Sequence, residues 1–186
     1  ALDYVAERFK TIMATYGPRS VLWSERPGPF SDMSKALMRG LGSPNYCTHD
    51  DACAHNVNQA SYSLTGHGRG KWIYDFKNCR HIVVQGRNFL ESLKVGELNQ
   101  VLDALDKGCR LTCVDVRPTV TGLKAQQNLC IRPGTDLALN LAVLHVLIEE
   151  KLYDAAYVER YVQDFEALAD FVRPYSPQWA ESRCDI

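Results

Sequence analysis

The sequence predicts an α/β fold in which a Rossmann-like parallel sheet is covered by helices on both faces, as a three-layer domain. Two short apolar runs carry this prediction, at 81–85 and 110–115, and an amphipathic segment at 92–106 connects them. Strand, helix and strand at this spacing form a βαβ unit, whose two strands lie parallel. We expect residues 1–186 to form one such α/β domain.

Hydrophobic period and turn residues place the other elements. We expect a short strand at 20–24, a third strand of the sheet at 129–131 and irregular structure over 42–52. The helices are expected at 2–16, 31–41, 54–64, 136–151, 154–161 and 164–172. Residues 136–151 are apolar nearly all round, which predicts that this helix is well buried.

Composition excludes several classes of protein. Of the 186 residues, 46% are hydrophobic and 23% are charged, which fits an ordinary soluble globular protein. The net charge of −1 argues against a dedicated nucleic-acid binder. No apolar run approaches the length of a membrane span. The first seven residues do not form a secretory signal, so the sequence leaves cytoplasm and periplasm both open.

Seven cysteines are present, an odd number without regular spacing, and this disfavours a disulfide framework. Because no two cysteines form a CxxC pair, we expect neither a self-contained zinc site nor an iron–sulfur cluster within this chain. Cys109 and Cys113 flank a predicted strand and are interpreted as small buried hydrophobes.

Cys53 is the candidate catalytic residue. It follows a polar, turn-rich stretch and lies near the expected start of a helix, where terminal N–H groups favour a thiolate. A thiolate is a soft metal ligand or a nucleophile, and an inert cysteine is the structural alternative. His49 and His55 flank it, so a cysteine hydrolase stays open, but a zinc site lacks an evident fourth ligand. His145, in an apolar helix, is interpreted as a hydrogen-bonded core histidine.

Three segments are expected at the carboxyl edge of the parallel sheet, where ligands bind in open α/β folds. They are 86–88, 115–119 and 133–136. Gly86 allows a ligand to approach the backbone, and Asp115 stands where nucleotide-binding folds place an acid for a ribose or base. Arg117 and Thr119 could hold a phosphate, and Asp136 could accept from the N1–H and exocyclic amine of a guanine.

Each of these residues also has a plain structural interpretation. Gly86 and Asp115 suit ordinary turns, Arg117 suits a surface charge, and Thr135 or Asp136 suits a helix N-cap. Taken one at a time, the structural interpretations are favoured. Their order along one βαβ edge favours nucleotide binding.

The same ordered segments resemble an internal piece of the catalytic subunit of a molybdopterin-dependent oxidoreductase of the dimethyl-sulfoxide-reductase superfamily. The resemblance is to the polysulfide, thiosulfate or tetrathionate reductase branch and covers nearly the whole chain. It rests on 42–53, 82–88 with Glu91-Ser92, 114–121, 131–136 with Ala138-Leu139, 152–154 and 175–177. Such subunits are several times longer, so the resemblance implies a natural, excised or engineered part of a larger subunit.

The resemblance implies specific roles for residues of this sequence. Cys53 would be the protein ligand to molybdenum or tungsten. One guanine-dinucleotide arm of the molybdopterin guanine dinucleotide cofactor would be bound by Gly86, Arg87, Asn88, Asp115, Arg117, Thr119, Gly134 and Asp136. The reaction would be a two-electron transfer of an oxygen or sulfur atom, on an inorganic sulfur compound.

The implied partners are the remaining domains of the catalytic subunit and an iron–sulfur electron-transfer subunit. Three functions stay open at this point: part of a redox enzyme, a non-catalytic nucleotide- or pterin-binding module, and a small cysteine hydrolase. Bound metal that depends on Cys53 favours the first. Guanine-nucleotide binding that depends on Asp136, without redox activity, favours the second, and failure of a thiol reagent to label Cys53 preferentially counts against the third.

Overall fold

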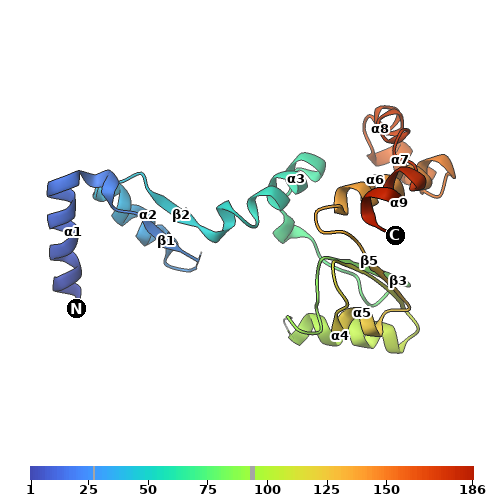
Figure 1. The fold of residues 1–186 in the computed structure, drawn as a ribbon, viewed down its shortest axis with the longest axis horizontal. Coiled ribbons are helices and arrows are strands. Elements are labelled where there is room, and N and C mark those ends of the chain that lie inside the picture. Colours follow the sequence, from blue (N-terminus) through green and yellow to red (C-terminus); the bar gives the residue numbers. More distant parts are fainter. Residues whose placement is uncertain (27, 93–94) are drawn as a thin grey trace. The chain divides into compact units, whose positions relative to one another are not determined.

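The computed structural model describes residues 1–26, 28–92 and 95–186, and the chain divides into two compact units, Ala1–Tyr74 and Asp75–Ile186 (Figure 1). That residues 1–186 form a single domain stays a prediction. Over the described ranges, no helix combines the length and the apolar character that a membrane crossing requires.

The first unit contains a small parallel sheet, in which β1 and β2 pair with Ser24 opposite Cys47. The α-helix that follows Cys53 ends at Gly66, which takes the left-handed conformation that glycine adopts without strain. The elements are α1 (Leu2–Tyr16), η1 (Pro18–Ser20), β1 (Trp23–Glu25), α2 (Ser31–Gly40), β2 (Tyr46–Thr48), η2 (His49–Asp51), α3 (His55–Thr65) and η3 (Arg69–Lys71).

The second unit holds a three-stranded parallel sheet in the order β3-β4-β5, with Ile82 opposite Leu111 and Val114 opposite Leu129. This arrangement confirms the predicted βαβ unit. The elements are β3 (His81–Gln85), α4 (Val95–Asp106), β4 (Arg110–Asp115), α5 (Val120–Lys124), β5 (Gln127–Cys130), α6 (Asp136–Glu149), α7 (Ala155–Tyr161), α8 (Phe165–Val172) and α9 (Pro177–Cys184).

Helices cover both faces of this sheet, so the predicted three-layer α/β architecture is confirmed (Figure 1). On one face, Ile82 and Leu111 pack against Val101 and Ala104 of α4. On the other face, Val114 and residues of β5 pack against α6 and α9. Alternate side chains of β4 therefore enter two different apolar clusters, as the period of two along a strand requires.

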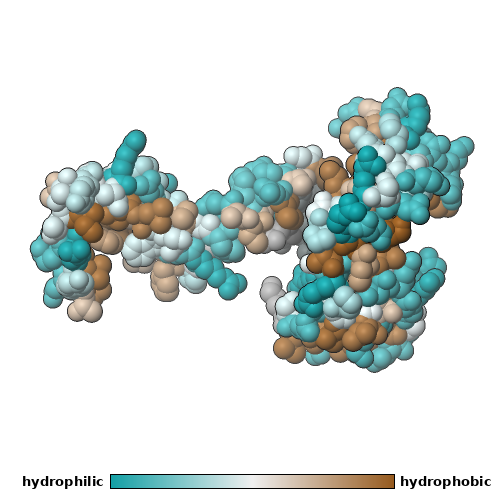
Figure 2. Space-filling view, in the orientation of Figure 1, coloured by the Kyte–Doolittle hydropathy of each residue, from teal (hydrophilic) through white to brown (hydrophobic). Residues whose placement is uncertain are grey.

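The prediction that the helix at 136–151 is well buried is wrong. Ala138 and Ala142 are buried in α6, but Leu137 is 70% exposed and Val143 is 49% exposed. The reason is that α8 and α9 pack against α6 and cover only part of its circumference. Apolar side chains accordingly reach the surface over several elements (Figure 2).

Other differences from the sequence predictions are local. The expected irregular segment 42–52 contains β2, whose three residues have no visible alternation, and the strand expected at 20–24 lies at Trp23–Glu25. Neither α5 nor α9 was expected. Residues 93–94, in the predicted start of the helix at 92–106, lie outside the described residues.

Candidate functional site at the carboxyl edge of the sheet

The carboxyl ends of β3, β4 and β5 lie at one edge because the three strands are parallel. Gly86 continues the ladder by donating its N–H to the carbonyl of Val114 at 2.9 Å. Ile131 likewise donates to the carbonyl of Asp115 at 3.0 Å. The three predicted segments therefore follow three neighbouring strand ends, which is the position that open α/β sheets use for ligands.

Two glycines at this edge adopt backbone conformations that favour a residue without a side chain. Gly86 has φ +61° and Gly134 has φ +82°, in the left-handed region that other residues rarely adopt. No atom lies within 4 Å of the position that a Cβ would take at either residue. Backbone groups at both turns are thus open to an approaching ligand.

The turn before α6 is anchored by α9. The Arg132 guanidinium donates to both carboxylate oxygens of Asp185 at 2.9 and 2.5 Å, and this pairing raises the pKa of Arg132. The Arg132 N–H also donates to the carbonyl of Cys184 at 2.9 Å. Gly134 is therefore presented on a fixed turn.

Asp136 is the first residue of α6, yet its side chain does not cap that helix. The N-cap residue, Thr135, also makes no side-chain capping bond, and its hydroxyl donates to the carbonyl of Arg132 at 2.6 Å. The Asp136 carboxylate instead accepts from the Gln85 amide at 2.9 Å. The side-chain bonds of Thr135 and Asp136 therefore do not favour the interpretation that either residue simply caps α6.

Asp115 and Arg117 follow β4. The Asp115 carboxylate accepts from the Val116 N–H at 2.7 Å, which is a local turn contact. The Arg117 guanidinium donates to the Pro118 carbonyl at 3.2 Å and lies 3.9 Å from Glu91, with both charged side chains largely in solvent. Such an exposed ion pair contributes little, so the guanidinium is free to turn toward an anion.

Arg87 and Asn88 contact other parts of the protein. Arg87 forms an ion pair with Glu97 of α4 at 3.0 Å. The Asn88 carbonyl oxygen accepts from the buried Thr121 hydroxyl at 2.8 Å, and its amide donates to Glu91. Asn88 thereby links the loop after β3 to α5, and its direct contact with a ligand stays a prediction.

Thr119 has a structural role in this geometry. It is only 4% exposed, and its hydroxyl accepts from the Gly122 N–H at 3.0 Å as the N-cap of α5. A capping hydroxyl satisfies a helix N–H that otherwise lacks a partner. Phosphate binding by Thr119 stays a prediction that these bonds do not favour.

Cys53 belongs to the first unit, where it is exposed in the turn just before α3. His55, at the start of α3, contacts the Gln59 amide at 3.4 Å. In the ranges that the structure covers, no three His, Cys, Asp or Glu side chains are grouped to hold a metal ion. A single exposed thiol fits a metal whose other ligands come with a cofactor, and it does not fit a structural zinc site.

The two cysteines and the histidine that the sequence assigns to the core are buried or partly buried, as predicted. Cys109 and Cys113 are buried, and burial raises the pKa of both thiols. His145 is partly buried and its ring lies 3.2 Å from the carbonyl of Val172. None of the three belongs to the carboxyl edge.

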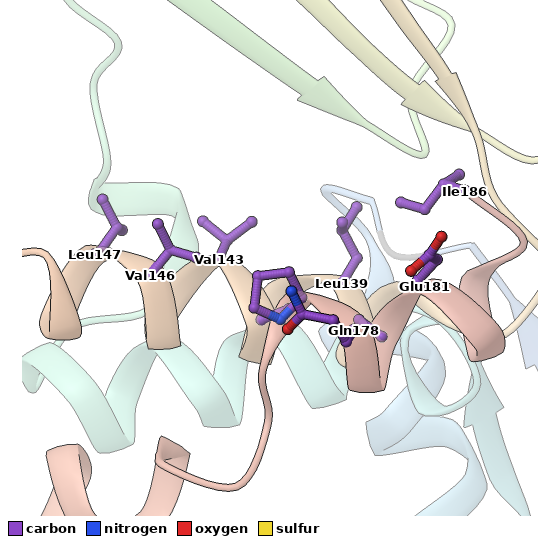
Figure 3. A pocket seen from close by; sticks show the side chains of 10 residues that line it. Leu139, Val143, Val146, Leu147, Gln178, Glu181 and Ile186 are labelled. Carbon is purple, nitrogen blue, oxygen red and sulfur yellow. The ribbon is translucent and has the colours of Figure 1, made fainter.

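Described residues of the second unit line at least two hollows. One is an apolar groove of about 460 Å³ between α6 and α9, lined by Leu139, Val143 and Val146 among others and by none of the predicted site residues (Figure 3). The other, of about 490 Å³, includes Gly134 and Thr135 in its wall. There the Arg183 guanidinium lies 4.3 Å from the centre of the Trp179 ring. Of these two hollows, the second adjoins the carboxyl edge.

Sequence reasoning missed Gln85 and Thr121 as members of this edge. A signal for Gln85 was available, because it is a polar residue at the end of an otherwise apolar strand. Thr121 carried no such signal, since its importance comes from a bond to a residue 33 positions away.

The chain belongs to the molybdopterin oxidoreductase family, whose model matches residues 1–169. This finding confirms the resemblance inferred from the edge motifs. The family implies a molybdenum or tungsten pterin cofactor, which agrees with the metal and the pterin expected from the sequence.

The relatives are larger proteins of several named activities. The chain is 36% identical, over its full length, to the thiosulfate reductase molybdopterin-containing subunit PhsA of Salmonella typhimurium, of which it covers 24%. It is 34% identical over 94% of its length to the acetylene hydratase of Syntrophotalea acetylenica, of which it covers 24%. The solved acetylene hydratase from Pelobacter acetylenicus matches 99% of the chain with a TM-score of 0.77 and 30% identity, over 25% of that structure.

Proposed function

We propose that the chain is the cofactor-binding part of a molybdenum or tungsten oxidoreductase that uses bis-molybdopterin guanine dinucleotide. Its reaction would be a two-electron transfer of an oxygen or sulfur atom, on an inorganic sulfur compound. The observation that carries the nucleotide part is the Asp136 carboxylate, held at the open carboxyl edge between two positive-φ glycine turns. The thiosulfate reductase relative supports the sulfur substrate.

The residues of the second unit would bind the guanine-dinucleotide arm. Asp136 would accept from the guanine, and the open backbone at Gly86 and Gly134 would admit the ligand closely. Arg117 would exchange its weak contact with Glu91 for a phosphate, because charge-assisted bonds from arginine to phosphate are stronger than an exposed ion pair. Asn88 would keep the two neighbouring loops in place.

Cys53 would supply one thiolate to the metal. The bound group would supply the two-electron atom-transfer chemistry, while the chain supplies position and electrostatics. An exposed thiol immediately before a helix suits this role, since soft thiolates are preferred ligands of such metals. The partners would be the rest of a larger catalytic subunit and an iron–sulfur electron-transfer subunit, which the coverage of about a quarter of each relative supports.

Metal and pterin content test this function directly. The purified chain is incubated with the molybdenum-loaded pterin cofactor, separated from excess, and examined by elemental analysis and pterin fluorescence. We expect both components to remain bound, and Cys53→Ala to retain less of the metal-loaded cofactor than the unmodified chain. Cys130→Ala is the matched control, because Cys130 is also exposed.

Equal metal content in Cys53→Ala and the unmodified chain would remove Cys53 from the site. Guanine nucleotide binding without metal would favour a non-catalytic binding module. Preferential labelling of Cys53 by a thiol reagent in a chain that takes up neither metal nor pterin would favour the cysteine hydrolase.

A further inference from the structure

One side-chain hydrogen bond crosses the carboxyl edge of the sheet. The Gln85 amide nitrogen donates to a carboxylate oxygen of Asp136 at 2.9 Å. Gln85 is the last residue of β3, and Asp136 is the first residue of α6, which follows β5. Because β4 lies between β3 and β5, this bond joins the end of one outer strand, β3, to the helix that follows the other outer strand.

Both members of this bond are half-buried, and with the residues that the structure describes neither side chain makes another hydrogen bond. The amide of Gln85 offers N–H groups, so it holds Asp136 as a hydrogen-bond acceptor. The start of α6 favours negative charge at the same position. The second carboxylate oxygen keeps its full accepting capacity for a ligand.

We infer that Gln85 is a positioning residue that fixes the Asp136 carboxylate and thereby selects guanine over other purines. The inference rests on the proposed function, in which Asp136 meets the base. Guanine presents two adjacent donors, its N1–H and its exocyclic amine, to a carboxylate. Adenine presents an acceptor at N1, which a fixed acceptor repels, and hypoxanthine lacks the exocyclic amine.

A carboxylate without this bond rotates about its side-chain torsions and must be ordered again when the base binds. Loss of Gln85 should therefore weaken the contact that needs both donors more than the contact that needs one. A bond that only tied β3 to α6 would change stability and leave base preference alone. The ratio of affinities for two bases is thus the measurement that separates positioning from a purely structural role.

The test measures binding of GDP, IDP and ADP to the full chain by calorimetry. We expect GDP to bind more tightly than IDP, and ADP to bind most weakly. Gln85→Met keeps the size of the side chain but removes the donor, and we expect it to lower GDP affinity about tenfold while IDP affinity changes little. Gln85→Lys restores a donor and should regain most of the GDP preference.

Gln126→Met is the matched control. The Gln126 side chain accepts from the Leu111 N–H at 2.6 Å near the start of β4, away from the carboxyl edge. It should lower the melting temperature without changing the ratio of GDP to IDP affinity. Gln85→Asn, which keeps an amide but shortens its reach, replaces Gln85→Met if the latter does not fold.

The outcomes separate the two levels of inference. An unchanged GDP-to-IDP ratio in Gln85→Met, with GDP binding abolished by Asp136→Ala, would overturn the role of Gln85 and leave the proposed function standing. Failure of the unmodified chain to bind GDP, or GDP binding that Asp136→Ala does not weaken, would overturn both. Collapse of the ratio in Gln85→Met with recovery in Gln85→Lys would support the inference.

Discussion

Ala1–Tyr74 and Asp75–Ile186 differ in how many apolar side chains they bury. Among the residues described, three apolar residues are buried in the first unit, Val21, Met38 and Ala54, and fourteen in the second. The residues described in α1 include none that is buried. The second unit can therefore hold the carboxyl edge of its sheet with its own core, whereas the first depends more on polar contacts.

Three side-chain hydrogen bonds of the first unit converge on Glu25. Its carboxylate accepts from the Tyr46 hydroxyl at 2.6 Å, the Trp23 indole at 2.9 Å and the Ser34 hydroxyl at 2.9 Å. Together these bonds join β1, β2 and α2. Bonds to an ionised carboxylate are stronger than those between neutral groups, which suits a region with little apolar burial.

The largest expected difference between the units comes from the core of the second. Leu111→Ala removes a fully buried side chain of β4 and should cost about 2–5 kcal/mol of unfolding free energy. Hydrogen exchange with mass spectrometry should show faster exchange in 75–186 and little change in 1–74.

The control for this change is Leu123→Ala, because Leu123 is 81% exposed. It should alter stability by less than about 0.5 kcal/mol. Equal losses in both units after Leu111→Ala would mean that they unfold as one body, and would end the distinction drawn between them.

A smaller effect is expected at the N-cap of α5. Thr119→Ala should cost about 1 kcal/mol, because the Gly122 N–H loses its acceptor, while Thr119→Ser should retain most of the stability. Urea unfolding measures this cost. If Thr119 acts only as a cap, GDP affinity stays unchanged in Thr119→Ala, which loses the hydroxyl but should remain folded; a fall in affinity there that Thr119→Ser restores would make Thr119 a phosphate ligand.

The third effect is a loss of stability of the first unit in acid, and it does not appear at neutral pH. The hydrogen bond from Tyr46, followed by that from Trp23, lowers the pKa of Glu25 from 4.5 to about 2. A carboxyl group with a lowered folded pKa contributes stability above its ordinary pKa, and this contribution is lost as pH falls from about 4.5 toward 2. Hydrogen exchange in 1–74 should therefore accelerate over that range.

Tyr46→Phe removes the main cause of the lowered pKa, so the first unit should become less sensitive to pH within that window. Tyr16→Phe is a matched control, because Tyr16 is 74% exposed and lies in α1. An identical acid response in Tyr46→Phe and the unmodified chain would show that Glu25 does not govern the stability of this unit.

The sheet and its edge could be predicted because they depend on local patterns. The topology of the sheet follows from one βαβ unit. This unit consists of the β-branched run at 81–85, the run at 110–115 and the helix between them. Gly86 and Gly134 were recognisable because a turn after a strand and a turn before a helix commonly need positive φ. The family resemblance then gave these positions a common purpose.

The remaining features depend on contacts that no local pattern records. Gln85 meets Asp136 across 51 positions, and Thr121 meets Asn88 across 33. The exposure of α6 also could not be predicted from its sequence, because the apolar character of a helix does not show which other elements pack against it. Thr119 was assigned to a ligand from its place after β4, although a hydroxyl three residues before an N–H serves equally as a cap.

The central position of β4 has a consequence for slow motions of the protein. Its backbone is paired on both sides, and Leu111 and Cys113 are fully buried. Its amides should therefore exchange with solvent only when the whole second unit opens, whereas those of the edge strands exchange through smaller openings. Asp115 ends this slowest segment, so the loop that carries Arg117 starts from the part of the sheet that opens last.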